Sequence, residues 1–328
     1  MNSSILQVRD LRVHYYTRQG AVRAVNGVSF DLHAGERLGL VGESGSGKST
    51  TAIALMRLIK PPGKIEGGQV LLDGLSLLEL SEERMRRIRL AEIALVSQGA
   101  MNSLNPVARV RRQIEDALRD HDVQLTPRER TEWIGELLQR VDLPRTAAEM
   151  YPHELSGGMK QRVCIAIAIC LRPKVIIADE PTSALDVVVQ HEVMETLETL
   201  QTELGASLIL IGHDMGLMAQ AVDRLGVMYA GDLVETGGIE ELFGEPLHPY
   251  TRLLMASLPS LEQKEAARGI PGLTPSLLNR PEGCPFHPRC PDAFDRCKVE
   301  EPKLRTVRPS RDVACHLHWA DSAGREAS

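Results

Sequence analysis

The chain has 328 residues and a formal net charge of -6, and 43% of its residues are hydrophobic and 25% charged. A chain of this length and composition usually forms about two domains and buries its core without cross-links. The negative charge argues against a dedicated nucleic-acid-binding protein, because such a protein needs a basic face to neutralise phosphates.

Two sequence features bear on where the protein works. The N-terminal stretch MNSSILQVRD lacks the basic region and the apolar stretch of a secretory signal. The longest unbroken apolar run, residues 163–171, is shorter than the roughly 20 residues that a membrane-spanning helix needs. We therefore expect a soluble cytosolic protein, or one that attaches to a membrane from its cytosolic side. Structural disulfides are not expected in that compartment, because the cytosol keeps thiols reduced.

The first hundred residues alternate strand patterns with turns. The short apolar run that ends at Gly42 is typical of a buried strand. A glycine-rich turn follows it and opens into a helix of small and apolar residues that extends to about residue 59. The expected strands lie at 6–16, 21–32, 36–42, 67–74 and 92–98.

The pattern then becomes helical over about residues 99–163, with prolines between the helices. Strand patterns return at 174–180, 207–214 and 224–237, and a long helix at 187–204 follows the first of them. Strands that alternate with helices predict an α/β fold with a parallel sheet covered on both faces. The helical stretch at 99–163 is interpreted as an insertion into that sheet domain.

The last part of the chain has a different composition. From residue 259 onward prolines and cysteines become dense and the periodicity fades. We therefore expect a main domain at 1–258 and a small, irregular C-terminal domain at 259–328.

The segment Gly42-Glu-Ser-Gly-Ser-Gly-Lys48-Ser49 matches the phosphate-binding loop (P-loop) pattern G-x-x-x-x-G-K-[ST]. Its glycines let backbone N–H groups converge on phosphate oxygens, and the following helix presents its positive end to them. Lys48 is expected to reach the β- and γ-phosphates of ATP, and the Ser49 hydroxyl to coordinate Mg²⁺. The residues predicted to bind the nucleotide here are Ser44, Gly45, Ser46, Gly47, Lys48, Ser49 and Thr50.

A second motif, residues 175–180, is an apolar strand that ends in two carboxylates. Asp179 fits a partner of Mg²⁺, and Glu180 fits a group that polarises the water attacking the γ-phosphate. Such a pair is only suggestive by itself, because acidic residues at a strand end are also common in solvated turns. The P-loop makes the catalytic interpretation the stronger one.

A third motif, Leu155-Ser-Gly-Gly-Met159, follows a Tyr-Pro-His-Glu turn and opens a helix. Ser156 and the amides of Gly157 and Gly158 would form a second anion-binding helix start. A single ATP site needs only one such cradle. We therefore expect a dimer in which the second cradle of each subunit covers the nucleotide of the other.

With these three motifs the chain resembles the ATPase subunits of ABC transporters, a family of P-loop NTPases whose signature is LSGG(Q). The resemblance implies ATP hydrolysis and roles for further residues. Gln98 fits the Q-loop, as a catalytic residue and Mg²⁺ ligand, and His213 fits the switch histidine. Tyr15 would stack on adenine, with Tyr16 the weaker candidate. Ser183-Ala-Leu-Asp186 fits the D-loop, and Met159 replaces the commonest signature residue, glutamine.

The C-terminal part narrows the resemblance to peptide-importer ATPases. Two segments resemble the C-terminal extension of the dipeptide, oligopeptide and nickel permease group, namely Pro246-Leu-His-Pro-Tyr250 and the later GCPFHPRC. One segment of the main domain departs from that group, because Ser97-Gln-Gly-Ala-Met replaces the commoner aromatic-Gln-Asp-Pro. The resemblance implies a homologous second ATPase, which in this branch is usually a different chain, two membrane permeases and an extracellular solute-binding protein as partners. Importers of oligosaccharides or nickel are the alternative within this branch. A non-transport ABC ATPase is disfavoured, because no coiled-coil insertion or second cassette is visible.

Four of the six cysteines, Cys284, Cys290, Cys297 and Cys315, lie in this extension. Their spacing lacks the tight C-x2-C pairs usual for zinc ribbons. Four thiolates are the normal ligand set of an iron–sulfur cluster, and the resemblance implies a [4Fe–4S] cluster. Structural zinc and free thiols remain open. Cys164 and Cys170 lie in an apolar helix and are expected to be core residues, since free cysteine packs as a small hydrophobe.

Overall fold

The computed structural model describes residues 4–183, 185–257 and 269–318. None of the helices in these ranges is both long and apolar enough to cross a membrane. The strands are β1 (Ser4–Thr17), β2 (Gly20–His33), β3 (Arg37–Val41), β4 (Gly63–Leu72), β5 (Leu75–Ser76), β6 (Ile93–Val96), β7 (Val175–Asp179), β8 (Ser207–Ile211), β9 (Arg224–Tyr229), β10 (Asp232–Gly238), β11 (Arg305–Arg308) and β12 (Arg311–Val313). The α-helices are α1 (Lys48–Leu55), α2 (Glu82–Ile88), α3 (Val110–Asp120), α4 (Pro127–Arg140), α5 (Gly157–Ile169), α6 (Val187–Leu204), α7 (Met215–Ala221), α8 (Ile239–Gly244), α9 (Pro249–Ala256) and α10 (Asp295–Val299).

The strands form two sheets. One is a four-stranded antiparallel sheet in the order β2-β1-β4-β5, and the other has eight strands in the order β11-β12-β10-β9-β3-β8-β7-β6. In the larger sheet the five strands from β9 to β6 are parallel, and antiparallel pairing begins at β10. The prediction of a parallel sheet therefore holds for its central part, while the N-terminal strand patterns build a separate sheet.

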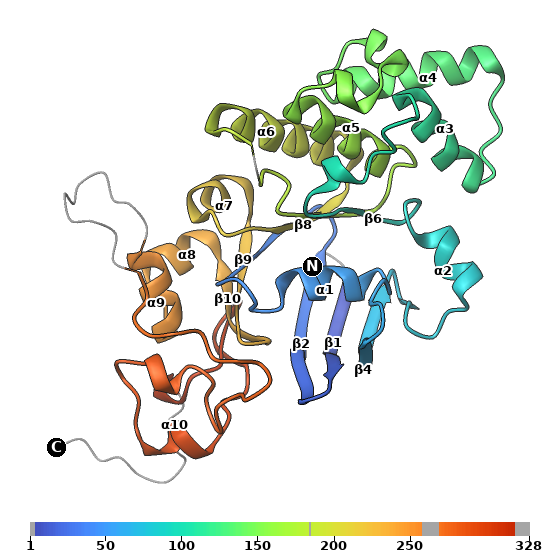
Figure 1. Cartoon of the computed structure of the whole chain (residues 1–328). Coiled ribbons are helices and arrows are strands. Elements are labelled where there is room, and N and C mark those ends of the chain that lie inside the picture. The colour runs from blue at the N-terminus through green and yellow to red at the C-terminus, as the bar shows by residue number, and fades with distance from the viewer. Residues whose placement is uncertain (1–3, 184, 258–268, 319–328) are drawn as a thin grey trace.

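The large sheet is the middle layer of the molecule. Helices α5, α6 and α7 cover one face, and α1 with the antiparallel sheet covers the other (Figure 1). Alternate residues of the central strands enter two different cores: in β7, Ile176 packs with the helices, whereas Val175 and Ile177 pack with the antiparallel sheet. A strand with apolar residues on both faces is what a sheet covered on both sides requires.

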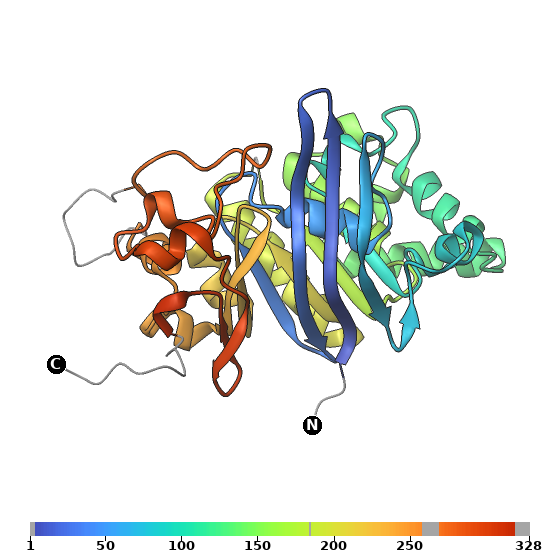
Figure 2. The same ribbon diagram turned by 90° about the horizontal axis from the view of Figure 1, so that it is seen from below.

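The helices α3 and α4 lie between β6 and β7 in the chain, where the insertion was expected. They sit at one end of the molecule, and the C-terminal region that contains α10 sits at the other end (Figure 2). The antiparallel sheet lies between them.

The C-terminal region is joined to the sheet of the main domain. Strand β12 pairs antiparallel with β10, and β11 pairs with β12. Two strands thus extend the edge of the large sheet, which the fading periodicity of this region did not predict. The expected domain boundary at residue 258 falls outside the described residues, and the division into two domains stays a prediction.

A buried ion pair holds this extension in place. Arg311 donates a hydrogen bond of 2.7 Å to Glu235 of β10, and their side chains are 2% and 0% exposed. The same carboxylate accepts the backbone N–H groups of Leu247 and His248 at 2.8 and 2.9 Å. One arginine and two backbone N–H groups therefore compensate the charge on Glu235.

Removal of the Arg311 charge is expected to destabilise the protein strongly. In Arg311→Met the Glu235 carboxylate stays buried without its cation, and we expect a loss of about 3–5 kcal/mol in the free energy of unfolding. The matched control is Arg308→Met, because Arg308 pairs with Glu245 in solvent, and a loss below about 1 kcal/mol is expected there. Urea denaturation of both variants measures the difference, and equal losses would contradict the assignment.

Candidate active site

The candidate site is built at the carboxyl ends of four neighbouring parallel strands. In the order β3-β8-β7-β6, the chain leaves β3 into the P-loop, β8 toward His213, β7 into Glu180 and β6 toward Gln98. Ligands of α/β proteins bind at this edge of the sheet, because the loops from adjacent strands converge there. The strand order therefore brings together residues that lie far apart in the sequence.

The P-loop connects β3 to α1 and needs glycine at two positions. Gly42 has a φ of 146° and a Cβ there would lie 2.1 Å from the carbonyl oxygen of Met228. Gly47 has a φ of 105° and a Cβ would lie 2.3 Å from the carbonyl oxygen of Ala24. Both positive φ angles and both close approaches exclude other residues, because any side chain would collide with backbone. The loop is thus shaped for backbone N–H groups to face a ligand.

Lys48 lies buried at the start of α1, with 6% of its surface exposed. Its Nζ donates to the carbonyl oxygens of Gly42 and Glu43 at 2.8 and 3.0 Å and to Ser46 Oγ at 3.3 Å. Burial lowers the pKa of Lys48, while nearby carboxylates, Glu180 first among them, act in the opposite direction. The ammonium group is therefore held beneath the loop, where it can turn to an incoming phosphate.

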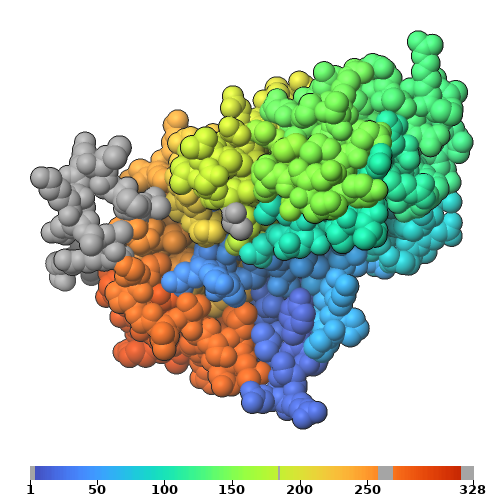
Figure 3. Space-filling view, turned by 45° about the horizontal axis from the view of Figure 1, so that its top comes forward, coloured from blue at the N-terminus to red at the C-terminus, as the bar shows by residue number. Residues whose placement is uncertain are grey.

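The remaining P-loop residues differ in exposure. Ser46 is buried, Ser44 and Gly45 are exposed, and Gly47, Ser49 and Thr50 are half-buried. The blue surface of this part of the chain lies between the green helical region and the orange C-terminal region (Figure 3). The loop is thus open to a ligand from one side and bordered by protein on two others.

Two of the three residues predicted to coordinate Mg²⁺, Ser49 and Asp179, meet in the structure, whereas the third, Gln98, donates to Glu180 instead. Ser49 Oγ donates a hydrogen bond of 3.0 Å to Asp179 Oδ1, which joins the start of α1 to the end of β7. Asp179 is 3% exposed, and burial raises the pKa of its carboxyl group, although the hydrogen bond from Ser49 opposes this. A carboxylate and a hydroxyl are oxygen ligands of the kind that Mg²⁺ prefers. These residues fit the ion.

Glu180 is contacted by both predicted catalytic partners. Gln98 Nε2 donates a hydrogen bond of 2.7 Å to Glu180 Oε2, and His213 Nδ1 lies 3.7 Å from Oε1. A cavity of about 60 Å³ beside Glu180 and His213 is large enough for a water molecule. Glu180 is thus placed between an amide, an imidazole and a space for water.

The backbone of Glu180 is in an unusual conformation. Its φ is 47°, a left-handed value that costs a non-glycine residue on the order of 1 kcal/mol. The N–H of Glu180 donates to the carbonyl oxygen of Ile211 at 2.8 Å, and Ser183 Oγ donates to the Glu180 carbonyl oxygen at 2.9 Å. These bonds hold the carboxylate out of the sheet edge toward Gln98.

The signature segment lies at the start of α5. Ser156 caps α5 by accepting a hydrogen bond of 3.3 Å from the N–H of Met159, and Ser156 and Gly157 are exposed. A Cβ on Gly158 would lie 2.6 Å from Val189 at the start of α6. The start of α5 belongs to the helical layer above the sheet, apart from α1 (Figure 1). An exposed helix start of this kind is available to a second molecule.

The two candidate aromatic residues lie on opposite faces of β1. Tyr15 is half-buried beside Ile59, and a Cβ on Gly63 would lie 2.5 Å from its ring. Tyr16 is 48% exposed, and its hydroxyl donates to Glu66 Oε1 at 2.9 Å. The assignment of adenine stacking to Tyr15 stays a prediction.

The four C-terminal cysteines gather in one region without disulfides. Cys284, Cys297 and Cys315 are buried and Cys290 is half-buried, and all four are free. The Cys284 N–H donates to the carbonyl oxygen of Cys297 at 2.8 Å. Burial raises the pKa of Cys284 to about 12 and that of Cys315 to about 11, and neighbouring cysteines add to both shifts. The thiols are therefore close enough to influence one another.

A metal site is not evident from this arrangement. Within residues 4–257 and 269–318, residue 184 excepted, no group of three or more His, Cys, Asp or Glu side chains is placed to hold a metal ion. This weighs most directly against a single zinc ion, whose four ligands must lie about 2.3 Å from one point. The [4Fe–4S] prediction is not confirmed. Cys164 and Cys170 are buried in the main core, as expected.

Glu43 and its two partners, Arg289 and Tyr250, were not assigned to the site from the sequence. Glu43, an unspecified position of the P-loop pattern, forms an ion pair with Arg289 of the cysteine-rich segment at 2.7 Å. The N–H of Glu43 also donates to the hydroxyl of Tyr250 at 2.8 Å. Nothing in the P-loop pattern specifies these partners, because they lie more than 200 residues away.

Comparisons with known proteins agree with this geometry. The family models "ABC transporter" and "Oligopeptide/dipeptide transporter, C-terminal region" match residues 25–183 and 234–297. The dipeptide transport ATP-binding protein DppD of Escherichia coli K12 is 43% identical over 325 residues, which cover 98% of this chain and 99% of that protein. The chain belongs to the family of dipeptide and oligopeptide ABC transporter ATP-binding subunits. The oligopeptide transport ATP-binding protein OppD of Salmonella typhimurium LT2 is 45% identical, with 95% of this chain and 93% of that protein covered.

Solved structures are similar to the main domain. A dimeric structure of MJ0796, a bacterial ABC transporter cassette, has a TM-score of 0.64 and 27% identity and covers 71% of this chain and 98% of that one. Another dimeric structure of MJ0796, in a post-hydrolysis state bound to ADP and Pi, also has a TM-score of 0.64, with 26% identity. The predicted fold class and the predicted ATPase activity of this family are thereby confirmed.

Proposed function

We propose that this chain is the ATP-hydrolysing subunit that powers peptide import through a membrane ABC transporter. The observation that carries the proposal is the meeting of Gln98, Glu180 and His213 beside the P-loop, together with an exposed signature helix. Relatives that match nearly the full chain are named for dipeptide and oligopeptide transport. The same role for an oligosaccharide or nickel is the alternative.

In the proposed reaction, Glu180 accepts a proton from the water that attacks the γ-phosphate. Gln98 and His213 hold the Glu180 carboxylate on either side and orient the water. Lys48 leaves the carbonyl oxygens of its own loop and donates to phosphate oxygens, which neutralises charge as it develops. Mg²⁺, held by Ser49, Asp179 and Gln98, supplies further charge neutralisation.

The signature helix is proposed to complete the site of a partner. Ser156 and the amides of Gly157 and Gly158 would contact the γ-phosphate of the nucleotide bound to a homologous second ATPase, in a head-to-tail pair. The exposure of Ser156 and Gly157 supports this arrangement. ATP closes such a dimer, closure acts on the two permeases near Gln98, and hydrolysis reopens it.

The transport role is tested by purification of the tagged chain from membranes of its native host. We expect two polytopic membrane proteins and a second ATPase to co-purify from the cytoplasmic face, with no nucleic acid. A cognate extracellular solute-binding protein loaded with a dipeptide is expected to stimulate ATP hydrolysis by the reconstituted complex. Stimulation by an oligosaccharide or nickel instead would replace the substrate, and co-purification of ribosomes or nucleic acid would overturn the role.

We also propose that Cys284, Cys290, Cys297 and Cys315 hold a [4Fe–4S] cluster. The gathering of four free thiols in one region and their number, the usual ligand set, support this. The raised pKa values of Cys284, Cys290 and Cys315 mean that these three thiols are neutral without a metal, so binding would release protons. The cysteine-rich segment between β10 and β11 would then be held by the cluster as well as by its own packing.

Anaerobic purification followed by iron, sulfide and zinc analysis tests the cluster. About four irons and four sulfides per chain are expected, and Cys297→Ala is expected to lose them. Cys164→Ala is the matched control, since Cys164 lies in the core of the main domain, and it should keep the iron. Zinc without iron, or neither metal, would contradict the proposal.

A further inference from the structure

Arg289 lies inside the cysteine-rich segment but is directed at the P-loop. It belongs to a short 3-10 helix, His287–Arg289, that fills the space between Cys284 and Cys290. Its side chain is 4% exposed and forms a two-pronged ion pair with Glu43, with distances of 2.7 Å from Nη1 and 2.9 Å from Nη2. Paired parallel hydrogen bonds between arginine and a carboxylate fix geometry as well as charge.

The remaining hydrogen-bond donors of Arg289 are also used. Its guanidinium donates to the carbonyl oxygens of Ile270 and Pro271 and to the hydroxyl of Tyr229, at 3.2, 2.9 and 3.2 Å, and lies over the Tyr229 ring. Phe286, three residues before, packs edge-on against Tyr229. Arg289 is therefore held in one orientation by its surroundings and is not a mobile surface charge.

Glu43 is equally constrained on the P-loop side. Its N–H donates to the Tyr250 hydroxyl, its carbonyl oxygen accepts from Lys48 Nζ, and its carboxylate accepts from Thr274 Oγ1 at 2.9 Å as well as from Arg289. One residue of the loop thus connects the phosphate-binding lysine to three residues from the last 80 positions of the chain. A displacement of Arg289 would move the backbone that carries the carbonyl partner of Lys48.

We propose that Arg289 positions the P-loop for ATP, so that the folded state of the four-cysteine segment sets the affinity of the ATP site. Arg289 acts through Glu43 and is a positioning residue. Without it, the Glu43 carboxylate loses its cation on the loop that would bind the phosphates, and the loop loses its contact with the cysteine-rich segment. Both effects oppose ATP binding, because like charges repel and a mobile loop must be ordered again. The proposal rests on the ATP site proposed above.

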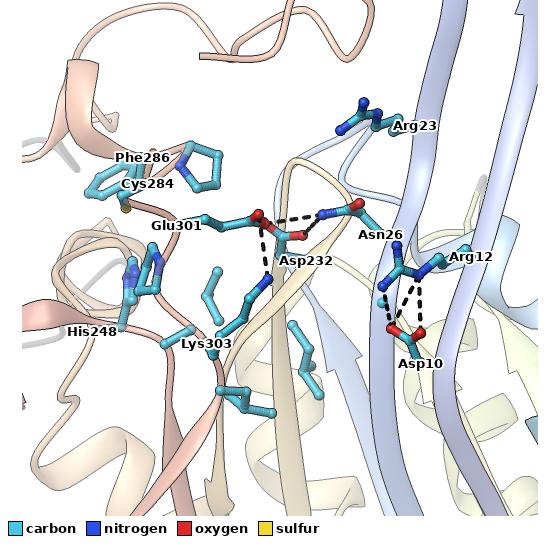
Figure 4. Close-up of a pocket in the computed structure, with 17 residues that line it drawn as sticks. Asp10, Arg12, Arg23, Asn26, Asp232, His248, Cys284, Phe286, Glu301 and Lys303 are labelled. Carbon is cyan, nitrogen blue, oxygen red and sulfur yellow. Dashed lines mark hydrogen bonds and ion pairs between the residues drawn. The ribbon is translucent and has the colours of Figure 1, made fainter. Parts of the chain in front are cut away.

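The rest of the C-terminal region contacts the main domain through other residues, which do not belong to the Arg289–Glu43 pair. A cavity of about 350 Å³ lies between β1–β2 and the cysteine-rich segment, with Arg23, Asp232, Glu301 and Cys284 on its walls (Figure 4). Asp232 of β10, which lines this cavity, pairs with Arg280, and the side chains of Arg280 and Asp232 are 11% and 14% exposed. Arg280 is thus a buried arginine of the same region, paired to the same domain, but not to the P-loop. It provides a matched control.

The experiment titrates the full-length protein with the fluorescent analogue mant-AMP-PNP in the presence of Mg²⁺. Arg289→Ala is expected to raise the dissociation constant about tenfold, with a similar rise in KM for ATP and kcat changed by less than about twofold. Arg280→Ala should bind as the unchanged protein does. Arg289→Lys keeps the charge but loses the two parallel hydrogen bonds to Glu43, and we expect the dissociation constant to rise about threefold.

Glu43→Gln provides a second variant in case Arg289→Ala does not fold, which thermal unfolding will show. By itself Glu43→Gln should raise the dissociation constant, because it breaks the same pair from the side of the P-loop, and an unchanged value would overturn the proposal; where Arg289→Ala folds, the two effects should not add. An equal dissociation constant for Arg289→Ala and the unchanged protein, or an equal rise for Arg280→Ala, would overturn the role of Arg289. If the unchanged protein itself does not bind the analogue, the proposed ATP site is wrong instead.

The link to the cysteines has its own test. Cys290→Ser is expected to raise the dissociation constant in the otherwise unchanged protein, and to add little in the Arg289→Ala variant. Equal rises in the two backgrounds would show that the cysteines act on ATP by another route and would overturn the link. The readout is nucleotide binding, so it does not depend on hydrolysis.

Discussion

Replacement of Glu180 by glutamine is expected to stop turnover while ATP still binds. The change keeps the size of the side chain and its contact with Gln98, but it removes the group that accepts the proton from the attacking water. Loss of a general base lowers the rate by roughly a hundred- to ten-thousand-fold. Phosphate release at saturating ATP measures the rate, and nucleotide titration measures the affinity, which should change by less than about twofold.

The control for this prediction is Glu195→Gln, since Glu195 is an exposed residue of α6. It should keep the full rate. If Glu180→Gln hydrolyses ATP at the unchanged rate, the base must be another residue, and the contacts of Glu180 with Gln98 and His213 would have a structural purpose. Loss of ATP binding in this variant would instead indicate that the left-handed backbone at Glu180 does not tolerate the change.

The parts of the site that lie within one short segment could be predicted from the sequence. The P-loop is such a segment, because its glycines, Lys48 and Ser49 are fixed relative to one another by one strand, one turn and one helix start. Asp179 and Glu180 follow the same logic at the end of β7. In each motif the sequence spacing alone determines which atoms face the ligand.

The meeting of Gln98, Glu180 and His213 depends on the order of strands, which no short segment encodes. Their strands β6, β7 and β8 are neighbours in the sheet although they are separated by whole helices in the chain. The resemblance to a known family assigned roles to these three residues, and the contacts of Gln98 and His213 with Glu180 agree with those roles.

The C-terminal region was the least predictable part. Short strands with polar neighbours, such as β11 and β12, have no clear periodicity, so their pairing with β10 was not expected. Arg289 was counted only as part of a cysteine-rich segment, because a charged residue carries no sign of its partner. The ion pairs of Arg289 with Glu43 and of Arg311 with Glu235 join this region to the main domain, and the sequence pattern did not predict either pair.

Replacement of Lys48 by alanine is expected to weaken ATP binding by about a hundredfold. In the structure its ammonium group donates hydrogen bonds to two carbonyl oxygens and a hydroxyl of its own loop. The positive charge therefore lies at the expected phosphate site before ATP binds. Hydrogen bonds from a charged donor to phosphate contribute about 1.5–3 kcal/mol each. The loss of two such bonds exceeds what the backbone N–H groups of the loop can replace.

The expected loss follows from position rather than from charge in general, and Lys174→Ala makes the distinction. Lys174 is also a lysine beside a strand of the central sheet, but it is paired with Asp73 and Glu92 on the surface. Its loss should leave the dissociation constant for mant-AMP-PNP unchanged. An equal rise of the dissociation constant in both variants would mean that ATP binding depends only on the net charge of the protein. The buried Lys48 would then be a structural residue of the loop.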